Sequence, residues 1–250
     1  MSVNRKKQFV LLLLVVVIAG LLSILGTAAA DSPVTPFPPD SSPYGQTYDE
    51  WAEEFWLWVG RVKVKDIDDH PLLAVDPYDV ECKLGQQGKV WFLGGIYAGA
   101  GTESRTCKVP AGKALFFPIV NILCSPLAHD PPDPAILLAC AVNPGDVYGF
   151  EFDMYPVSAT IDGADIPDLE DYYVLSEATF EIGRIPDQIR DPNIFGADAG
   201  TVEPAASSGY YLMLPPLSEG SHIINFVGVI AVEGTPYPTD MTYFLEVVDD

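Results

Sequence analysis

Consecutive apolar positions predict one central strand in this chain. The residues from 107 to 121 read CKVPAGKALFFPIVN. Pro110 and Gly112 are typical of a turn, because proline fixes φ and glycine tolerates a positive φ. The run that follows, from Ala114 to Val120, is apolar throughout, which is typical of a strand buried on both faces. We therefore expect other elements to cover both sides of this strand.

A helical period in the apolar residues predicts an amphipathic helix that begins near residue 47. Thr47 and Glu50 have the T-x-x-E spacing of a capping box, which marks the first turn of a helix. Large apolar residues then recur at positions i, i+4, i+7 and i+11, namely Trp51, Phe55, Trp58 and Val62. Such a stripe is typical of a helix that packs one face against a protein core.

The same helix carries more aromatic surface than one buried face requires, because Trp56 lies off the stripe. Two interpretations follow. Trp56 and Trp58 are candidate binding residues if a row of indole rings stacks on sugar rings of a polymer. Alternatively, aromatic residues at helical spacing belong to the core and pack against the sheet.

The second half of the chain predicts a succession of strands separated by Gly and Pro turns. The expected strands are Val147–Tyr155, Val157–Ile161, Tyr172–Ile182, Gly209–Leu214, Ser221–Val232 and Thr239–Val248. Asp162-Gly163 is a hairpin-turn signal, and Asp133-Pro134 is the typical start of a short helix. We therefore expect an all-β fold over residues 44–250, a single β-sandwich or jelly-roll domain with an N-terminal amphipathic helix and one short helix.

The first 30 residues are expected to be an export signal. Three basic residues precede an apolar run from Phe9 to Leu25, and Ala28 to Ala30 form a small-residue cleavage site. An apolar run of this length is also at the lower limit for an uncleaved membrane anchor. Residues 31–43 are rich in Pro and Ser and predict a linker. We expect the protein to be secreted or associated with the cell envelope.

The net charge of the chain after this segment excludes one class of partner. All 35 acidic residues and 10 of the 13 basic residues follow position 30, so the mature net charge is 10 − 35 = −25. Nucleic-acid binding requires basic residues that neutralise phosphates, which this surface lacks. Three interpretations remain: solubility in a saline, halophilic habitat, binding of Ca²⁺ by carboxylates, or a cationic partner.

Four cysteines in an exported chain predict two disulfides. They are Cys82, Cys107, Cys124 and Cys140. Three pairings are available. We favour Cys82 with Cys107 and Cys124 with Cys140, since each pair encloses one short segment, although the sequence leaves the pairing open.

The candidate metal ligands are Asp66, Asp68 and Asp69, the densest local group of carboxylates. This segment does not match a calcium-binding EF-hand loop, because the positions that need Gly and Glu are Pro71 and Pro77. A solvated turn is the competing interpretation. No cofactor is predicted other than Ca²⁺ at such a site.

The candidate catalytic residues are His222, Arg105 and Lys113. Each is a basic group in an acidic chain, and each is expected near a strand end. A histidine base beside two cations that stabilise an oxyanion would suit a lyase or an esterase. In the competing interpretation, Arg105 and Lys113 pair with carboxylates and His222 is a strand residue with its own partners.

Four segments resemble a family of exported microbial proteins to which no activity is attached. They are YGQTYDEWAEEFWLWV, CKLGQQGKVWFLGG, RTCKVPAGKALFFPIVN and LPPLSEGSHIINFVG, and the likeness extends from Tyr44 to Val248. The characteristic positions of the family fall on Trp51, Trp56, Trp58, Trp91, Arg105, Cys107, Lys113, Asn121 and His222. The resemblance implies a shared fold and supplies no reaction.

Three functional hypotheses remain. The first is a non-catalytic binding or surface-associated module for an extracellular carbohydrate or other polymer, or a cell-surface ligand. The second is a secreted hydrolase or lyase that degrades a polymer. The third is a structural surface protein stabilised by calcium. The sequence contains no nucleophile elbow of the G-x-S-x-G type that would favour the second.

Overall fold

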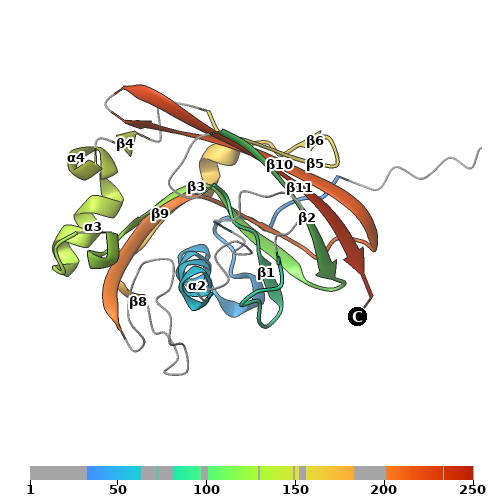
Figure 1. The fold of residues 1–250 in the computed structure, drawn as a ribbon, viewed down its shortest axis with the longest axis horizontal. Helices are drawn as coiled ribbons and strands as arrows, with labels where there is room; N and C mark the ends of the chain where they lie inside the picture. The colour runs from blue at the N-terminus through green and yellow to red at the C-terminus, as the bar shows by residue number, and fades with distance from the viewer. Residues whose placement is uncertain are drawn as a thin grey trace, which may run out of the picture. The chain divides into compact units, whose positions relative to one another are not determined.

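Two mixed β-sheets pack face to face in the computed structural model of the chain (Figure 1). The structure describes residues 33–62, 72, 81–96, 101–128, 130–148, 150–151, 156–182, 201–232 and 234–249. Residues from Val34 onward belong to one compact unit. This architecture confirms the prediction of a mainly β, two-sheet fold with short helices.

The strands are β1 (Val90–Phe92), β2 (Gly101–Pro110), β3 (Ala114–Cys124), β4 (Phe150–Glu151), β5 (Ser158–Ile161), β6 (Ala164–Asp165), β7 (Tyr173–Leu175), β8 (Phe180–Ile182), β9 (Glu203–Leu214), β10 (Gly220–Val232) and β11 (Thr235–Val248). The α-helices are α2 (Tyr48–Arg61), α3 (Pro134–Val142) and α4 (Pro144–Tyr148). Short 3-10 turns are η2 (Pro43–Gly45), η4 (Pro126–Ala128) and η5 (Leu169–Tyr172).

The five-stranded sheet has the order β1-β3-β9-β7, with β8 also paired to β9. The six-stranded sheet has the order β2-β11-β10-β5-β6, with β4 paired to β10. Both sheets are mixed, because β1 runs parallel to β3 and β2 runs parallel to β11. Strands distant in the sequence therefore lie side by side.

The central strand predicted from the apolar run is β3, and both of its faces are covered. On one face, Phe116 stacks on Tyr211 and contacts Trp51 of α2. On the other face, Phe117 stacks on Phe226 of β10, with ring centroids 4.9 Å apart. The six-stranded sheet, the five-stranded sheet and α2 thus form three successive layers (Figure 1).

Helix α2 begins at the predicted capping box. The backbone N–H of Thr47 donates to Glu50 Oε2 over 2.8 Å. The apolar stripe is buried as expected, and Phe55 and Trp58 are fully buried. The helix ends at Arg61, before the chain turns extended at Val62.

The residues expected to be a linker pack on the domain from position 34 onward. The Phe37 N–H donates to the Met213 carbonyl over 2.8 Å, and the Pro43 carbonyl accepts from Trp51 Nε1 over 2.9 Å. Val34 and Phe37 also lie against the main core. A high proline content predicts that a segment forms neither a helix nor the hydrogen bonds of a β-strand. It does not determine whether the segment packs against the domain.

Four strand predictions in the second half are corrected by the structure. The strand expected over Tyr172–Ile182 is two strands, β7 and β8, and the strand expected from Gly209 begins at Glu203. A strand was expected from Val147 to Tyr155, whereas Pro144–Tyr148 is helix α4 and the strand described there is only β4. The final strand was expected from Thr239 but begins at Thr235. Among the described residues, β2 pairs with β11 only from Thr239 onward, so Pro236 and Pro238 face no described strand on that edge, which suits proline.

Both expected disulfides are present. One joins Cys82 to Cys107, and the other joins Cys124 to Cys140. This is the pairing that the spacing favoured. The first ties the segment before β1 to β2, and the second ties α3 to the end of β3. Within the described ranges, no helix is long and apolar enough to span a membrane.

Candidate functional site

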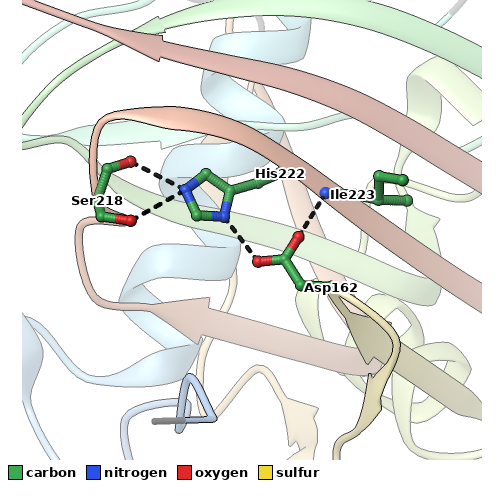
Figure 2. A network of polar contacts seen from close by, with 4 residues as sticks. All are labelled: Asp162, Ser218, His222 and Ile223. Carbon is green, nitrogen blue, oxygen red and sulfur yellow. Dashed lines mark hydrogen bonds and ion pairs between the residues drawn. The ribbon is translucent and has the colours of Figure 1, made fainter. Parts of the chain in front are cut away.

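A network of polar contacts surrounds His222 where β10 begins (Figure 2). The ring atom Nδ1 lies 2.7 Å from Asp162 Oδ2. The other nitrogen, Nε2, lies 2.9 Å from the Ser218 carbonyl oxygen and 3.4 Å from Ser218 Oγ. Asp162 Oδ1 also accepts from the Ile223 backbone N–H over 2.8 Å. The network therefore joins the β5–β6 turn to the first residues of β10.

The predicted hairpin turn places Asp162 in this network. Asp162 and Gly163 have φ values of 52° and 80°, as in the two-residue turns that fit the twist of paired strands. Aspartate tolerates a positive φ better than most residues. Because β5 pairs with β10, this turn lies beside His222, 60 residues away in the sequence.

The arrangement resembles a Ser-His-Asp set in composition, but its geometry favours a structural role. Both nitrogens of His222 face acceptors, namely the Asp162 carboxylate and the Ser218 carbonyl. A neutral imidazole has one N–H and donates to only one of these two acceptors. The nearer contact of Nε2 is the Ser218 main-chain carbonyl at 2.9 Å, whereas Ser218 Oγ lies at 3.4 Å, longer than a normal hydrogen bond between a serine and its base.

Arg105, the second candidate catalytic residue, is buried in the domain. Its Nη1 donates to the Gly94 carbonyl and to the Tyr243 hydroxyl, each over 3.0 Å, and its Nη2 donates to the Leu72 carbonyl over 3.4 Å. The guanidinium carbon also lies 5.9 Å from the centre of the Tyr243 ring. These contacts tie β2 to Gly94, Leu72 and β11.

Lys113, the third candidate, lies between β2 and β3, where its amine donates to the Gly88 carbonyl. The contacts of His222, Arg105 and Lys113 thus place the three basic groups in three different surroundings. The described contacts do not bring the three residues together, so they give no support to the predicted site for an oxyanion.

The prediction that Trp56 and Trp58 form an exposed binding row is wrong. Only 5% of Trp56 and 0% of Trp58 is exposed. Trp58 stacks on Phe92 and donates from Nε1 to the Leu84 carbonyl over 2.9 Å, while Trp56 packs edge-on against Phe55. Both faces of α2 that carry indole rings are covered, so a polymer cannot reach them.

The candidate calcium ligands Asp66, Asp68 and Asp69 lie outside the described residues. Within the described part of the chain, Cys124, Asp130 and Cys140 bring three ligand-type atoms together. The two sulfurs are bonded to each other, and Asp130 accepts from the Ser125 N–H over 2.7 Å. Metal-binding cysteines need free thiolates, so this group is structural.

Helix α2 carries one carboxyl with an unusual proton affinity. Partial burial, together with the neighbouring carboxylates of Asp49, Glu50 and Glu54, raises the pKa of Glu53 to about 7. Burial likewise raises the pKa of Tyr211 to about 12. Neither group lies in the His222 network.

The structure shows an exposed surface on the six-stranded sheet that the sequence pattern did not predict, and we call it the outer face. It consists of the side chains of β2, β11, β10 and β5 that point away from the five-stranded sheet. Two large apolar residues lie on it as direct cross-strand neighbours: Ile223 is 47% exposed and Phe244 is 44% exposed. We call these two residues the apolar pair.

A second set of side chains on the outer face, the polar row, runs across four strands beside the apolar pair. It consists of Ser104, Thr242, Asn225 and Thr160, which pair in that order. Asn225 Nδ2 donates to Asp240 Oδ1 over 2.7 Å, to Thr242 Oγ1 over 3.0 Å and to the Met241 carbonyl over 3.2 Å. The row is therefore held in a defined orientation.

The sequence contains only a weak signal for this surface. Strand β10 reads HIINFVGVI and is apolar on both faces, so its alternation does not show which side is exposed. Phe244 follows Tyr243 directly, and pattern alone does not distinguish the exposed ring from the buried one. Only the pairing of β2, β10 and β11 brings these residues together.

No family model and no curated protein matches the chain. A search of solved structures finds PbICP-C in complex with falcipain-2, at 12% sequence identity. The match covers 64% of this chain and 100% of that chain, with a TM-score of 0.25. A likeness at this level carries no argument about the function of the present chain.

Proposed function

We propose that this chain is a non-catalytic module, secreted or associated with the cell envelope, that binds an extracellular polymer through the outer face. The apolar pair carries the proposal. Single exposed apolar residues are common on protein surfaces. Phe244 and Ile223, however, are neighbours on the two central strands of the sheet and lie beside an ordered polar row.

The remaining features of the molecule agree with this proposal. Two disulfides suggest an oxidising, extracellular-type environment. The outer face is formed by paired strands, which reduces the backbone freedom that is lost when a ligand binds. The aromatic ring of Phe244 supplies a large apolar contact, and the polar row supplies directional hydrogen bonds.

The test is retention of the purified chain on immobilised extracellular polysaccharides and polyesters in high salt. We expect Phe244→Ala to weaken retention about tenfold, as for the loss of a central aromatic contact of about 1.4 kcal/mol. Tyr237→Ala is the matched control. Tyr237 is 45% exposed on the same strand, but strand alternation places it on the opposite face.

Equal loss of retention in the Phe244 and Tyr237 variants would contradict the proposal. So would unchanged retention when Phe244 is replaced. Far-ultraviolet circular dichroism and the melting temperature of each variant distinguish lost binding from lost fold.

The alternative function, a secreted polymer hydrolase or lyase, rests on the closeness of Ser218, His222 and Asp162. The same assay addresses it if soluble products are measured beside retention. Product formation that disappears in both Ser218→Ala and His222→Ala would favour the enzyme. Retention without products, unaffected by Ser218→Ala, supports the binding module.

A further inference from the structure

We infer that the polymer bound by the outer face is a neutral polysaccharide, with a sugar ring against Phe244 and its hydroxyls on Asn225 and Thr242. This inference rests on the proposed function and narrows its ligand to one chemical class. The orientation of two side chains and the charge of the surface around them support it.

The amide of Asn225 has one defined orientation. Its Nδ2 donates to the Asp240 carboxylate, which can only accept, and to the Met241 carbonyl, which can only accept as well. The amide nitrogen therefore points toward β11. Among the described residues, Asn225 Oδ1 has no hydrogen-bond donor and remains an acceptor for a ligand.

The hydroxyl of Thr242 is oriented by the same amide. Thr242 Oγ1 accepts from Asn225 Nδ2 over 3.0 Å, so one of its two lone pairs is engaged and its proton points away from that amide nitrogen. Within the described part of the chain, this O–H has no acceptor. Thr242 thus offers a donor next to the acceptor of Asn225.

An adjacent acceptor and donor, fixed in place, match two neighbouring hydroxyls of a sugar. Each sugar hydroxyl both donates and accepts, so one can donate to Asn225 Oδ1 while the next accepts from Thr242 Oγ1. Phe244 lies two residues from Thr242 on the same face, about 7 Å away along the strand. That spacing lets the C–H face of the same or the next sugar ring contact the aromatic ring.

The charge around this site favours a neutral ligand. The molecule carries a net charge of −25 beyond position 30, which repels polyanions such as polyuronates. The apolar pair, Thr106 beside it, and the polar row contain no charged residue. Three carboxylates border the site on the same face: Asp240 accepts from Asn225, Glu246 lies opposite Lys108 in the strand register, and Asp165 lies opposite Thr160. The residues that would contact the ligand are themselves uncharged, as suits a neutral polysaccharide.

The inference is tested by titration calorimetry of the purified chain. The probes are a panel of neutral glucans, mannans and galactans, a polyuronate and a glucosamine polymer. We expect binding within the neutral panel, and we expect Thr242→Val to weaken it about five- to tenfold through loss of one hydrogen bond. Thr102→Val is the matched control, because Thr102 is an exposed threonine on the outer face of β2, outside the polar row.

The outcomes separate this inference from the proposed function. Binding to the polyuronate or the glucosamine polymer alone, still sensitive to Phe244→Ala, would overturn the neutral class and leave the binding function standing. Equal effects of Thr242→Val and Thr102→Val would overturn the roles of Asn225 and Thr242. If no polysaccharide binds, the inference is wrong, and retention on non-carbohydrate polymers then decides whether the proposed function stands.

Discussion

The interaction between Asp162 and His222 shows how one residue pair holds two distant segments together. Asp162 accepts from the His222 ring and from the Ile223 N–H, and its own N–H donates to the Ile223 carbonyl over 2.8 Å. The start of β10 is thereby held against the β5–β6 turn. This also orients Ile223, which belongs to the proposed binding surface.

We expect Asp162→Asn to lower the free energy of unfolding by about 1 kcal/mol, since it removes a charge-assisted hydrogen bond that is partly solvent-screened. Asparagine still suits the positive φ of the turn. Asp165→Asn on β6 is the control, because Asp165 is an exposed aspartate of the same hairpin. Urea denaturation gives both values, and equal stability of the two variants would contradict a stabilising role for the Asp162–His222 pair.

Glu53 makes the stability of the protein depend on pH. Its pKa is about 7 in the folded protein, against an ordinary value of 4.5, so the folded state binds more protons between these values. Its contribution therefore favours folding most below pH 4.5 and declines as the pH rises through 7. We expect Glu53→Gln to flatten the fall in stability between pH 5 and pH 8.

Urea denaturation at several pH values measures this effect. Glu177→Gln, which removes an exposed carboxyl from a bend distant in sequence, is the control and should leave the slope unchanged. The same slope in the Glu53 variant and in the unaltered chain would show that this carboxyl does not titrate in the range.

At the scale of elements, the close contact of the two sheets depends on Gly228 of β10. A Cβ atom there would lie 2.7 Å from Val120 Cβ and 2.8 Å from the Ile119 carbonyl oxygen, both on β3. These distances are shorter than van der Waals contact, and the neighbours are a branched side chain and backbone. The sheets can therefore approach this closely only with glycine at this position.

We expect Gly228→Ala to destabilise the fold by about 1–3 kcal/mol, the usual cost of overpacking a core. Gly95→Ala is the matched control, because a Cβ at Gly95 meets no atom within 4 Å. Thermal unfolding of both variants provides the comparison. A Gly228 variant as stable as the Gly95 variant would mean that the sheets separate without cost.

The two elements that were predicted best are those whose sequence signals lie within the element itself. Helix α2 has its capping box at Thr47 and its apolar stripe at a helical period, and β3 has an unbroken apolar run after a Pro-Gly turn. The region from 144 to 182 was predicted less well. Its strands are two to four residues long, so they are stabilised by their partners β9 and β10 more than by their own pattern.

At the scale of the whole molecule, net charge dominates the expected response to salt. Self-repulsion among 35 acidic residues destabilises a compact state, and salt screens that repulsion. We expect the melting temperature to rise with NaCl, by about 2–4 °C for each 1 kcal/mol gained. CaCl₂ at the same ionic strength should give an equal rise if screening alone acts.

A further rise in millimolar CaCl₂ would instead indicate a calcium site. Replacement of Asp66, Asp68 and Asp69 by asparagine then tests the hypothesis that this group binds the ion. If the triple variant keeps the calcium response, the site lies elsewhere in the chain.

The sequence by itself determined the features that depend on neighbouring residues or on composition. These are the capped helix, the doubly buried strand, the presence of two disulfides and the acidic charge. Only the tertiary structure decided that Trp56 is buried, that His222 meets Asp162, and that Phe244 lies exposed beside Ile223. Local patterns follow the period of one element, whereas these contacts arise from strand pairing and layer packing between residues far apart in the chain.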